Sequence, residues 1–290
     1  MLWFDGMWSR LWNRLPFTSL PVGEIMVTTS LRQRLYKPDF LCVHGSRLYG
    51  LATDESDYDY RGLVVCPHEY YMGVNRFDQK EMDANDIAEL NKSVDLEHTI
   101  PLDSDIMIHD IRRFCYLALS GQTAFLELLF VPNELQIFTS PTFNMLHSKR
   151  NYFLSKAIYT RFGSYAHNEL EVAFGRKKKG KLGNRRRKLI KKFGYSPPNA
   201  ANALRLMVEA TQLLAYGQIV FPISNDGFRK QIMRVKLGEA SVKEVMVLQK
   251  DLKDSLYMAH CCSSLPATPN TDAVNKLLIF AILMRNRKGG

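Results

Sequence analysis

One short segment constrains this chain more than any other part of its 290 residues: GSRLYGLATDESDYDYRG, at positions 45–62. It contains Asp57 and Asp59, which stand two residues apart, so in an extended chain both carboxylates point to the same side. Two such charges at about 4 Å repel each other by about 4 kcal/mol at an effective dielectric constant of 20. The pair therefore needs a neutralising partner. Mg²⁺ is the usual one, because it binds carboxylate oxygens together with substrate phosphates.

The residues around this segment predict two strands joined by a turn. The apolar run 39–44 is typical of a buried strand, and 57–66 of a second strand that is broken or bulged at Gly62. Between them a Gly-Ser turn leads into a brief helix over 47–52. Free N–H groups at such a turn suit phosphate oxygens. Either feature alone is usually structural, but the two together indicate metal-assisted phosphoryl or nucleotidyl transfer.

A third predicted strand, over 104–108, supplies a further acidic candidate. It carries Asp105, and Asp103 has the same facing two residues earlier, so both stay open as the third metal ligand. Two histidines, His44 and His109, flank these strands. Buried histidines are more often hydrogen-bonded structural residues, and we assign neither a catalytic role.

The sequence pattern changes near residue 140 from mixed strands and helices to helices alone. Residues 67–100 are polar and irregular, which predicts a loop region, and a helix over 110–120 follows with Asp110 as its N-cap. Beyond residue 140 the apolar period near 3.6 predicts helices over 142–150, 154–174, 199–216, 226–237, 241–262 and 271–286. We therefore expect an α/β (α+β) domain over 26–139, an all-helical part over 140–290, and an N-terminal extension over 1–25.

The positive charge of the chain comes from one segment. The net charge is +10, from 39 basic and 29 acidic residues, and eleven of the basic residues fall within 176–192, which holds no acid. The glycines in this segment predict a basic loop followed by a helix from about Asn184. Such a cluster favours a polyanion, and RNA is the partner we favour. Its candidate phosphate contacts are Arg176, Lys177, Lys178, Lys179, Lys181, Arg185, Arg186, Arg187, Lys188, Lys191 and Lys192.

Cysteine usage and hydropathy predict a cytoplasmic protein. The five cysteines form no C-x-x-C pair and are odd in number, which favours free thiols, with Cys42 and Cys115 in apolar runs. No apolar run approaches the roughly 18 residues that would span a bilayer. The segment 1–25 carries three tryptophans and is open to two interpretations: a short amphipathic interfacial helix, or an extension before a domain that starts at Met26.

These features resemble the nucleotidyltransferase superfamily typified by DNA polymerase beta. Its signature is a Gly-Ser turn, an Asp-x-Asp about a dozen residues later, and a third acid on a later strand. Further stretches, DIMIHDIRRFCYLALSGQTAFLELLF, the Phe193-Gly194-Tyr195 region with Arg205, and SSLPATPN, are similar to the RNA repair pathway DNA polymerase beta family of bacteria and their phages. The similarity covers about residues 38–280.

The resemblance implies a minimal nucleotidyltransferase core, with a short mixed β-sheet flanked by helices and a helical C-terminal part. It implies that Asp57 and Asp59 bind two Mg²⁺ ions, or Mn²⁺, and that Asp105 shares the second ion and favours deprotonation of the attacking hydroxyl. The nucleoside triphosphate (NTP) would be held by Gly45, Ser46, Arg47 and Arg205. Two positions depart from the family pattern: Pro198 and Asn202 stand where the family commonly has a lysine and a histidine.

The leading hypothesis is a nucleotidyltransferase that adds a nucleoside monophosphate to an RNA 3′ end, tRNA-like in kind, and releases pyrophosphate. One alternative keeps this chemistry but transfers to a protein or small-molecule hydroxyl, as toxin or regulatory members of the superfamily do. A second alternative is a catalytically idle RNA-binding protein that kept the fold. The intact Gly-Ser turn and the acids argue against the last alternative, and the basic segment favours RNA over the other acceptors.

Overall fold

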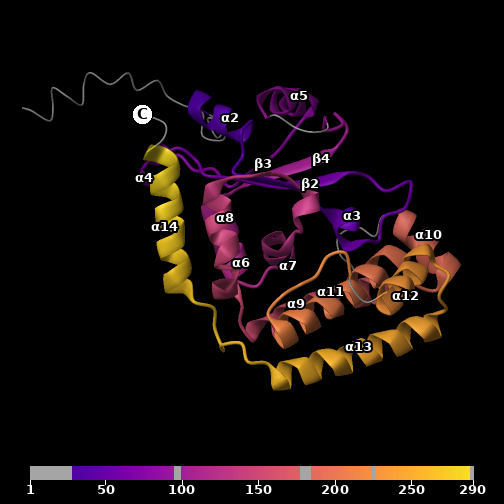
Figure 1. The fold of residues 1–290 in the computed structure, drawn as a ribbon. Helices are drawn as coiled ribbons and strands as arrows, with labels where there is room; N and C mark the ends of the chain where they lie inside the picture. The colour runs from indigo at the N-terminus through magenta and orange to yellow at the C-terminus, as the bar shows by residue number, and fades with distance from the viewer. Residues whose placement is uncertain (1–27, 95–98, 177–183, 224–225, 288–290) are drawn as a thin grey trace, which may run out of the picture.

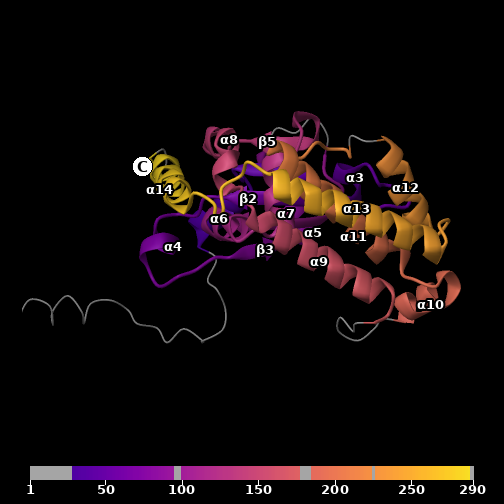
Figure 2. The same ribbon diagram turned by 90° about the horizontal axis from the view of Figure 1, so that it is seen from below.

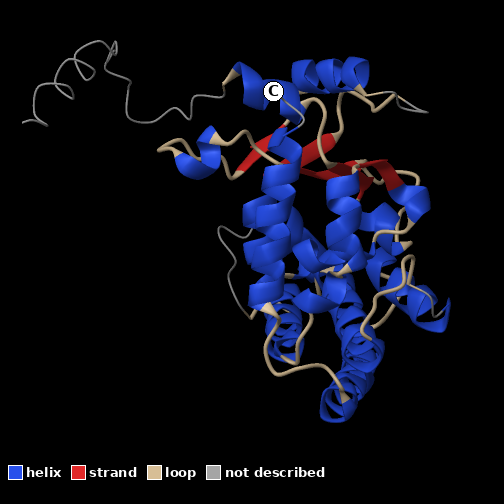
Figure 3. Ribbon diagram, turned by 60° about the vertical axis from the view of Figure 1, so that its left-hand side comes forward, coloured by secondary structure: helices blue, strands red, loops and turns tan. Residues whose placement is uncertain are grey.

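A computed structural model describes residues 28–94, 99–176, 184–223 and 226–287 of the chain. A five-stranded sheet lies across the molecule, with short helices on one side and a larger body of helices on the other (Figures 1 and 3). The predicted N-terminal extension over 1–25, together with Lys177, Lys178, Lys179 and Lys181, lies outside the described residues.

The sheet is mixed, as the family resemblance implies. Its strand order is β3-β4-β2-β1-β5, in which β2 and β4 run parallel and the other neighbours antiparallel. The strands are β1 (Phe40–Val43), β2 (Asp59–Val64), β3 (Gln79–Glu81), β4 (Asp105–Asp110) and β5 (Gln136–Thr139). The predicted fold class is therefore confirmed: an α+β N-terminal half with a mixed sheet, followed by a helical half.

The predicted break or bulge at Gly62 is wrong, because β2 pairs regularly on both of its sides. Gly62 lies opposite Leu41 on one neighbour and Ile108 on the other. A Cβ at this position would collide with the Ile108 side chain and come within 3.0 Å of the Phe40 carbonyl oxygen. The glycine is thus required for the close approach of neighbouring groups. The irregularity in the sheet lies instead between β1 and β5, at Leu41/Cys42.

The region 67–100 is more ordered than the sequence predicted. Its described residues form α4 (Glu69–Met72), strand β3 and α5 (Ala84–Ser93). Helix α5 begins with a capping box in which Asp83 accepts from the N–H groups of Asn85 and Asp86. Helix α5 buries Ile87 and Leu90, a helical spacing that the sequence prediction overlooked. Elements α4 and β3 are too short to show a hydrophobic period, and β3 exists through its backbone pairing with β4. Sequence periodicity could not reveal them.

Helices cover both faces of the sheet. The helices α2 (Thr29–Leu35) and α5 pack on one face, where Leu31, Leu90 and Ile108 belong to one buried cluster. On the other face lie α3 (Gly45–Tyr49), α6 (Ile111–Leu119), α7 (Thr123–Glu127) and α8 (Pro141–Ser148). Asp110 caps α6 as predicted, since its carboxylate accepts from the N–H groups of Arg112 and Arg113.

The helical half is built around one central helix. The predicted helices are confirmed with small shifts at their ends: α9 (Ala157–Ala173), α11 (Pro197–Tyr216), α12 (Asp226–Leu237), α13 (Val242–Cys262) and α14 (Thr271–Arg287). Most of α11 is buried, and α9, α12 and α13 pack around it (Figure 2). Helix α14 turns back and packs against α6 and α8 beside the sheet (Figure 1).

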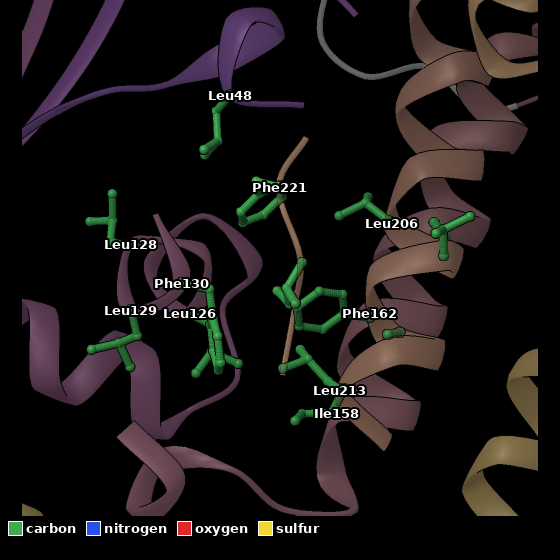
Figure 4. Packing of buried hydrophobic residues seen from close by; sticks show 14 of the residues in the cluster. Leu48, Leu126, Leu128, Leu129, Phe130, Ile158, Phe162, Leu206, Leu213 and Phe221 are labelled. Carbon is green, nitrogen blue, oxygen red and sulfur yellow. The ribbon is translucent and has the colours of Figure 1, made fainter. Parts of the chain in front are cut away.

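One hydrophobic core joins the two halves of the chain. Figure 4 shows Leu48 and Leu126 from the N-terminal half close to Phe162, Leu213 and Phe221 from the helical half. All five belong to one cluster of buried side chains. The expected boundary near residue 140 is therefore crossed by a continuous core.

Three of the five cysteines are buried free thiols, Cys42, Cys66 and Cys115. Cys261 and Cys262 are also free but exposed near the end of α13, so burial does not extend to every thiol. None of the helices in the described ranges is both long enough and apolar enough to traverse a lipid bilayer.

The continuous core predicts that the two halves unfold together. Phe162 is fully buried, and truncation to alanine leaves a cavity that costs about 3–5 kcal/mol of unfolding free energy. We expect Phe162→Ala to lower the denaturation midpoint in a single transition, followed by far-UV circular dichroism and tyrosine fluorescence. Tyr116→Ala, at a position 71% exposed, is the control and should change little. Two separated transitions in the wild-type protein would contradict a shared core.

Candidate active site

The Gly-Ser turn is built against the carboxylate of Asp59. The His44 N–H donates to the Asp59 carbonyl oxygen at 2.8 Å, which aligns the end of β1 with the start of β2. Gly45 follows with φ of +61°, in the left-handed region that favours glycine. A Cβ at this position would also collide with the Asp59 carboxylate. Both the backbone conformation and the close approach therefore require glycine here.

The two strand-borne acids stand directly beside each other. Asp59 is the first residue of β2 and Asp105 the first residue of β4, and the two are register partners on parallel strands. Their side chains consequently leave the same face of the sheet at the same edge. Asp57 precedes Asp59 by two residues and is exposed, whereas Asp103 lies in the turn before β4. The structure thus brings Asp105, and not Asp103, next to Asp59.

The acidic cluster holds more negative charge than its neighbours compensate. Burial raises the pKa of Asp59, and the charges of Asp105 and Asp57 raise it further, while Arg61 and His44 lower it. Arg61 Nη1 lies 3.6 Å from Asp105 Oδ1. Within the described residues, Asp57, Asp59 and Asp105 form no other ion pair. A cation would relieve the remaining repulsion.

Arg47 supports the loop that leads to Asp57. Its guanidinium carbon lies 3.6 Å from the centre of the Tyr58 ring, and its Nη2 donates to the Ser56 carbonyl oxygen at 2.8 Å. Its Nε is buried and has no hydrogen-bond partner within the described residues. Arg47 therefore lies next to the Gly-Ser turn, but its contacts are to Ser56 and Tyr58, the neighbours of Asp57 in the chain.

Two buried histidines lie behind the acids on the same face. Burial lowers the pKa of His109 to about 4, and Arg61, Arg113 and His44 add to the effect, so this imidazole is neutral near neutral pH. His44 Nε2 lies 3.4 Å from Glu127 Oε2 but lacks the alignment of a hydrogen bond. Neither imidazole makes a hydrogen bond to the side chain of Asp57, Asp59 or Asp105 in the described structure.

Arg205 lies in a buried ion network. Its Nη1 contacts Glu127 Oε1 at 2.9 Å and Glu209 Oε1 at 2.5 Å, and its guanidinium carbon lies 3.7 Å from the centre of the Tyr49 ring. The residue is only 5% exposed. Its charge is thus engaged by protein carboxylates, which does not suit the direct nucleotide contact that the resemblance implies.

The pKa values of the two carboxyl groups in this network, Glu127 and Glu209, are shifted in opposite directions. Burial disfavours ionisation of Glu127, but Arg205, His44 and the Tyr49 hydroxyl outweigh it and hold the Glu127 pKa well below its ordinary value. Burial raises the pKa of Glu209 well above its ordinary value, and the neighbouring Glu127 charge adds to this. The network therefore favours the ionised form of Glu127, whose carboxylate faces both Arg205 and the Tyr49 hydroxyl.

Sequence reasoning missed Glu127, although a signal was available. This acid stands within FLELLF, an otherwise apolar run. A charged residue in such a run is almost never fully buried unless it is paired. Tyr49, whose hydroxyl donates to Glu127 Oε2 at 2.6 Å, carries no comparable signal, because its role depends on the placement of α3.

A small cavity of about 150 Å³ adjoins the Gly-Ser turn. Its lining includes Ser46 from the N-terminal half and Asn202, Arg205 and Lys236 from the helical half. Pro198 and Asn202, the two departures from the family pattern, both face it. Lys236 was not singled out from the sequence.

The basic segment continues into α10 (Asn184–Phe193), which begins where the sequence predicted. The exposed cations of this helix are Arg185, Arg187, Lys188, Lys191 and Lys192, and Arg186 is half-buried. Arg176 pairs with Glu171 at 3.3 Å. Figures 1 and 2 place α10 toward the same end of the molecule as α3, opposite α14. The basic helix and the Gly-Ser turn therefore share one end of the protein.

The donor chemistry of the acidic cluster suits a hard divalent cation. Within the described ranges, no group of three or more His, Cys, Asp or Glu side chains is gathered closely enough to enclose a metal ion. Asp59 and Asp105 nevertheless begin adjacent strands as register partners, and Arg61 compensates their negative charge only in part. Carboxylate oxygens fit Mg²⁺, which usually keeps several waters and substrate oxygens as its other ligands.

The mixed sheet with a Gly-Ser turn beside register-paired aspartates is the arrangement that the resemblance to DNA polymerase beta-like nucleotidyltransferases implies. A comparison with protein-family models matches residues 32–279 to the RNA repair pathway DNA polymerase beta family. The chain belongs to this family, which confirms the resemblance seen in the sequence. Comparisons with curated proteins and with solved structures each found no match.

The electrostatics of Asp59 predict a pH-dependent gain in stability when its charge is removed. A raised folded-state pKa means that ionisation of Asp59 costs the folded state free energy. This cost is fully present above the folded pKa, declines as the pH falls through it, and vanishes below the ordinary value of 3.8. We expect Asp59→Asn to raise the melting temperature near neutral pH and to lose this advantage in acid.

The measurement is thermal unfolding of both proteins across a pH series. Asp103→Asn, in the exposed turn before β4, is the matched control and should leave the melting temperature unchanged. A lower melting temperature for Asp59→Asn near neutral pH would show that the carboxylate stabilises the fold, against this interpretation.

Proposed function

We propose that this protein is a metal-dependent nucleotidyltransferase that transfers a nucleoside monophosphate from an NTP to a hydroxyl of RNA and releases pyrophosphate. The observation that carries the proposal is the direct register of Asp59 and Asp105 on parallel strands, next to the Gly-Ser turn. Family membership supports the nucleotidyl chemistry. The other two alternatives, a different acceptor or an idle enzyme, become outcomes of the assay below.

Asp57, Asp59 and Asp105 are the residues that would hold the divalent ions. When bound, such ions lower the pKa of the attacking hydroxyl and neutralise charge on the leaving group. The chain itself brings these carboxylates to one edge of the sheet, since the parallel register of β2 and β4 places Asp59 beside Asp105. Asp105 is the more exposed of this pair, which suits it to accept the proton of an incoming hydroxyl.

The Gly-Ser turn supplies the contacts to the phosphates. His44, the residue before α3, makes no side-chain capping hydrogen bond in the described structure, so the N–H groups of the first turn stay available. In the reaction the acceptor oxygen forms a bond to the α-phosphorus, and the bond from that phosphorus to the pyrophosphate oxygen breaks. The hydroxyl proton leaves to Asp105 or to solvent. Gly45 and Ser46 hold the triphosphate in line for this displacement.

The first test is loss of transfer without loss of fold. We expect Asp59→Asn to reduce NTP-dependent labelling by more than about 100-fold. Mutating a residue that only supports a metal ligand typically lowers activity by about 10–100-fold, and loss of a ligand itself should cost more. Asp103→Asn is the control and should retain activity. The assay incubates the protein with each radiolabelled NTP, Mg²⁺ and total cellular RNA or lysate. Labelled RNA supports the proposal, labelled protein would change the acceptor, and no label on any macromolecule would contradict the activity.

RNA as the acceptor predicts a steep dependence of binding on salt. Lysines and arginines that contact phosphates release counterions, and the slope of log K against log salt is about −0.7 per contact for single strands. We expect the double variant Lys188→Gln, Lys191→Gln to bind RNA more weakly and to flatten this slope by about 1.4 units. The double variant Lys243→Gln, Lys250→Gln on α13 is the control. An unchanged slope in the α10 variant would assign the basic helix another role.

A further inference from the structure

The last helix of the chain is apolar on every side, but only one side of it is covered. Helix α14 contains eight consecutive apolar residues, LLIFAILM at 277–284. A helix that is hydrophobic all round is normally buried all round. Val274 and Ala281 are buried in the core, whereas a second stripe is 37–51% exposed and consists of Ile279, Phe280, Leu283 and Met284. We call this stripe the outer face of α14.

Ion pairs and hydrogen bonds hold α14 in this position. Arg285 Nε lies 3.1 Å from Oδ1 of the fully buried Asp39, and Arg34 Nη2 donates to Asn286 Oδ1 at 2.9 Å. The helix cannot turn its outer face inward without breaking these contacts. Figure 1 shows α14 at the edge of the molecule, and no element of the described ranges covers the exposed stripe. A partner that buries the outer face must therefore come from elsewhere.

A groove beside the outer face offers room for the side chains of such a partner. Its volume is about 470 Å³, and its apolar lining comes from three elements: Phe138 of β5, Pro141 and Met145 of α8, and Phe280 and Met284 of α14. Apolar side chains that enter a pocket of this kind commonly provide most of the binding energy of a protein interface. The groove and the outer face are continuous, because Phe280 and Met284 belong to both.

The charges at the two ends of α14 indicate that the partner is a second copy of this chain. Asp272 and Arg287 are both exposed, and neither forms an ion pair within the described residues. Asp272 stands seven residues before Ile279, and Arg287 stands seven residues after Phe280. Residues one heptad apart lie on the same side of a helix.

This spacing makes the outer face complementary to itself. When two α14 helices pack antiparallel with Ile279 opposite Phe280 of the second copy, Asp272 falls opposite Arg287 of the second copy. Two-fold symmetry repeats every such contact, so the same ion pair forms at the other end of the interface. An apolar centre with an ion pair at each end thus follows from one register.

We infer that the outer face of α14 and the adjoining groove form the interface of a homodimer, in which two α14 helices pack antiparallel about a two-fold axis. Helix α10 and the Gly-Ser turn lie at the other end of the molecule, so this dimer leaves the candidate active sites of both copies open (Figures 1 and 2). The inference does not depend on the proposed activity, because its evidence is the surface of α14 alone.

The first test measures the mass of the full chain in solution by sedimentation velocity and light scattering over a concentration series. We expect the wild type to approach twice the 33.4 kDa of one chain. Phe280→Asp places a carboxylate at the apolar centre and should raise the dimer dissociation constant at least about a hundredfold. Met258→Asp, at a position 60% exposed on α13, is the matched control and should remain a dimer. Circular dichroism establishes that each variant is folded.

The second test exchanges the charges at the helix ends. Asp272→Arg should weaken dimerisation by about tenfold, because it replaces two symmetry-related attractions by repulsions. Arg287→Asp should have a similar effect, and the double variant Asp272→Arg, Arg287→Asp should recover the wild-type affinity. Each exchange also places a charge unfavourably for the helix dipole, but that cost would accumulate in the double variant. Recovery is therefore specific to the antiparallel register.

Three results would each overturn the inference: a wild type with the mass of one chain at every concentration, a folded Phe280→Asp that remains a dimer, or a double variant no better than the single exchanges. Fluorescence then identifies one other occupant. The three tryptophans of the chain, Trp3, Trp8 and Trp12, all lie within residues 1–25, so their emission reports on that segment alone. A monomeric wild type whose tryptophan emission moves to longer wavelength in Phe280→Asp would show that residues 1–25 cover the outer face instead.

Discussion

The structure depends above all on the buried guanidinium of Arg205. This group, on α11, binds Glu127 from α7 and stacks on Tyr49 from α3, so a single side chain connects the helical half to both sides of the candidate site. Taking such charges out of water is expensive, and removal of one partner from a buried pair costs about 3–5 kcal/mol. Any other placement of α11 against α3 would leave an unpaired charge in the core. The network therefore specifies how the halves meet, and through α3 it fixes the position of the Gly-Ser turn.

At the acidic edge of the sheet, by contrast, the fold brings like charges together at a cost in stability. The parallel pairing of β2 and β4 places Asp59 beside Asp105, and the fold tolerates this repulsion with one partial compensation from Arg61. Interactions that destabilise a folded chain persist most readily where a ligand relieves them. The ion network of Arg205 thus holds the architecture together, whereas the acids at the edge of the sheet keep negative charge that a cation would neutralise.

Much of the site could be predicted from the sequence, because its motif is local. Gly45, Ser46, Asp57 and Asp59 lie within one turn and the start of one strand, and their spacing alone places them together. The sequence could not separate Asp103 from Asp105, since both have the same facing along the chain; the structure starts β4 at Asp105 and pairs it with Asp59, which supports Asp105 as the proposed ligand. Arg205 shows the limit of transfer by resemblance. The resemblance implies a nucleotide contact for Arg205, but in the structure its guanidinium pairs with Glu209, four residues later on α11, and with Glu127, which comes from a distant segment.

The strands β1, β2 and β4, the long helices after residue 140, the basic segment and the Gly-Ser-acid motif follow from the amino-acid pattern alone, because periodicity, turn chemistry and charge spacing are properties of neighbouring residues. Contacts between residues far apart in the chain needed the folded structure. Short polar elements such as β3 exist through pairing with β4, Gly62 is needed for the close approach of Ile108 and the Phe40 carbonyl, and Lys236 of α12 lines the same cavity as Ser46 of α3. Each of these depends on long-range packing, which leaves no local signature in the sequence.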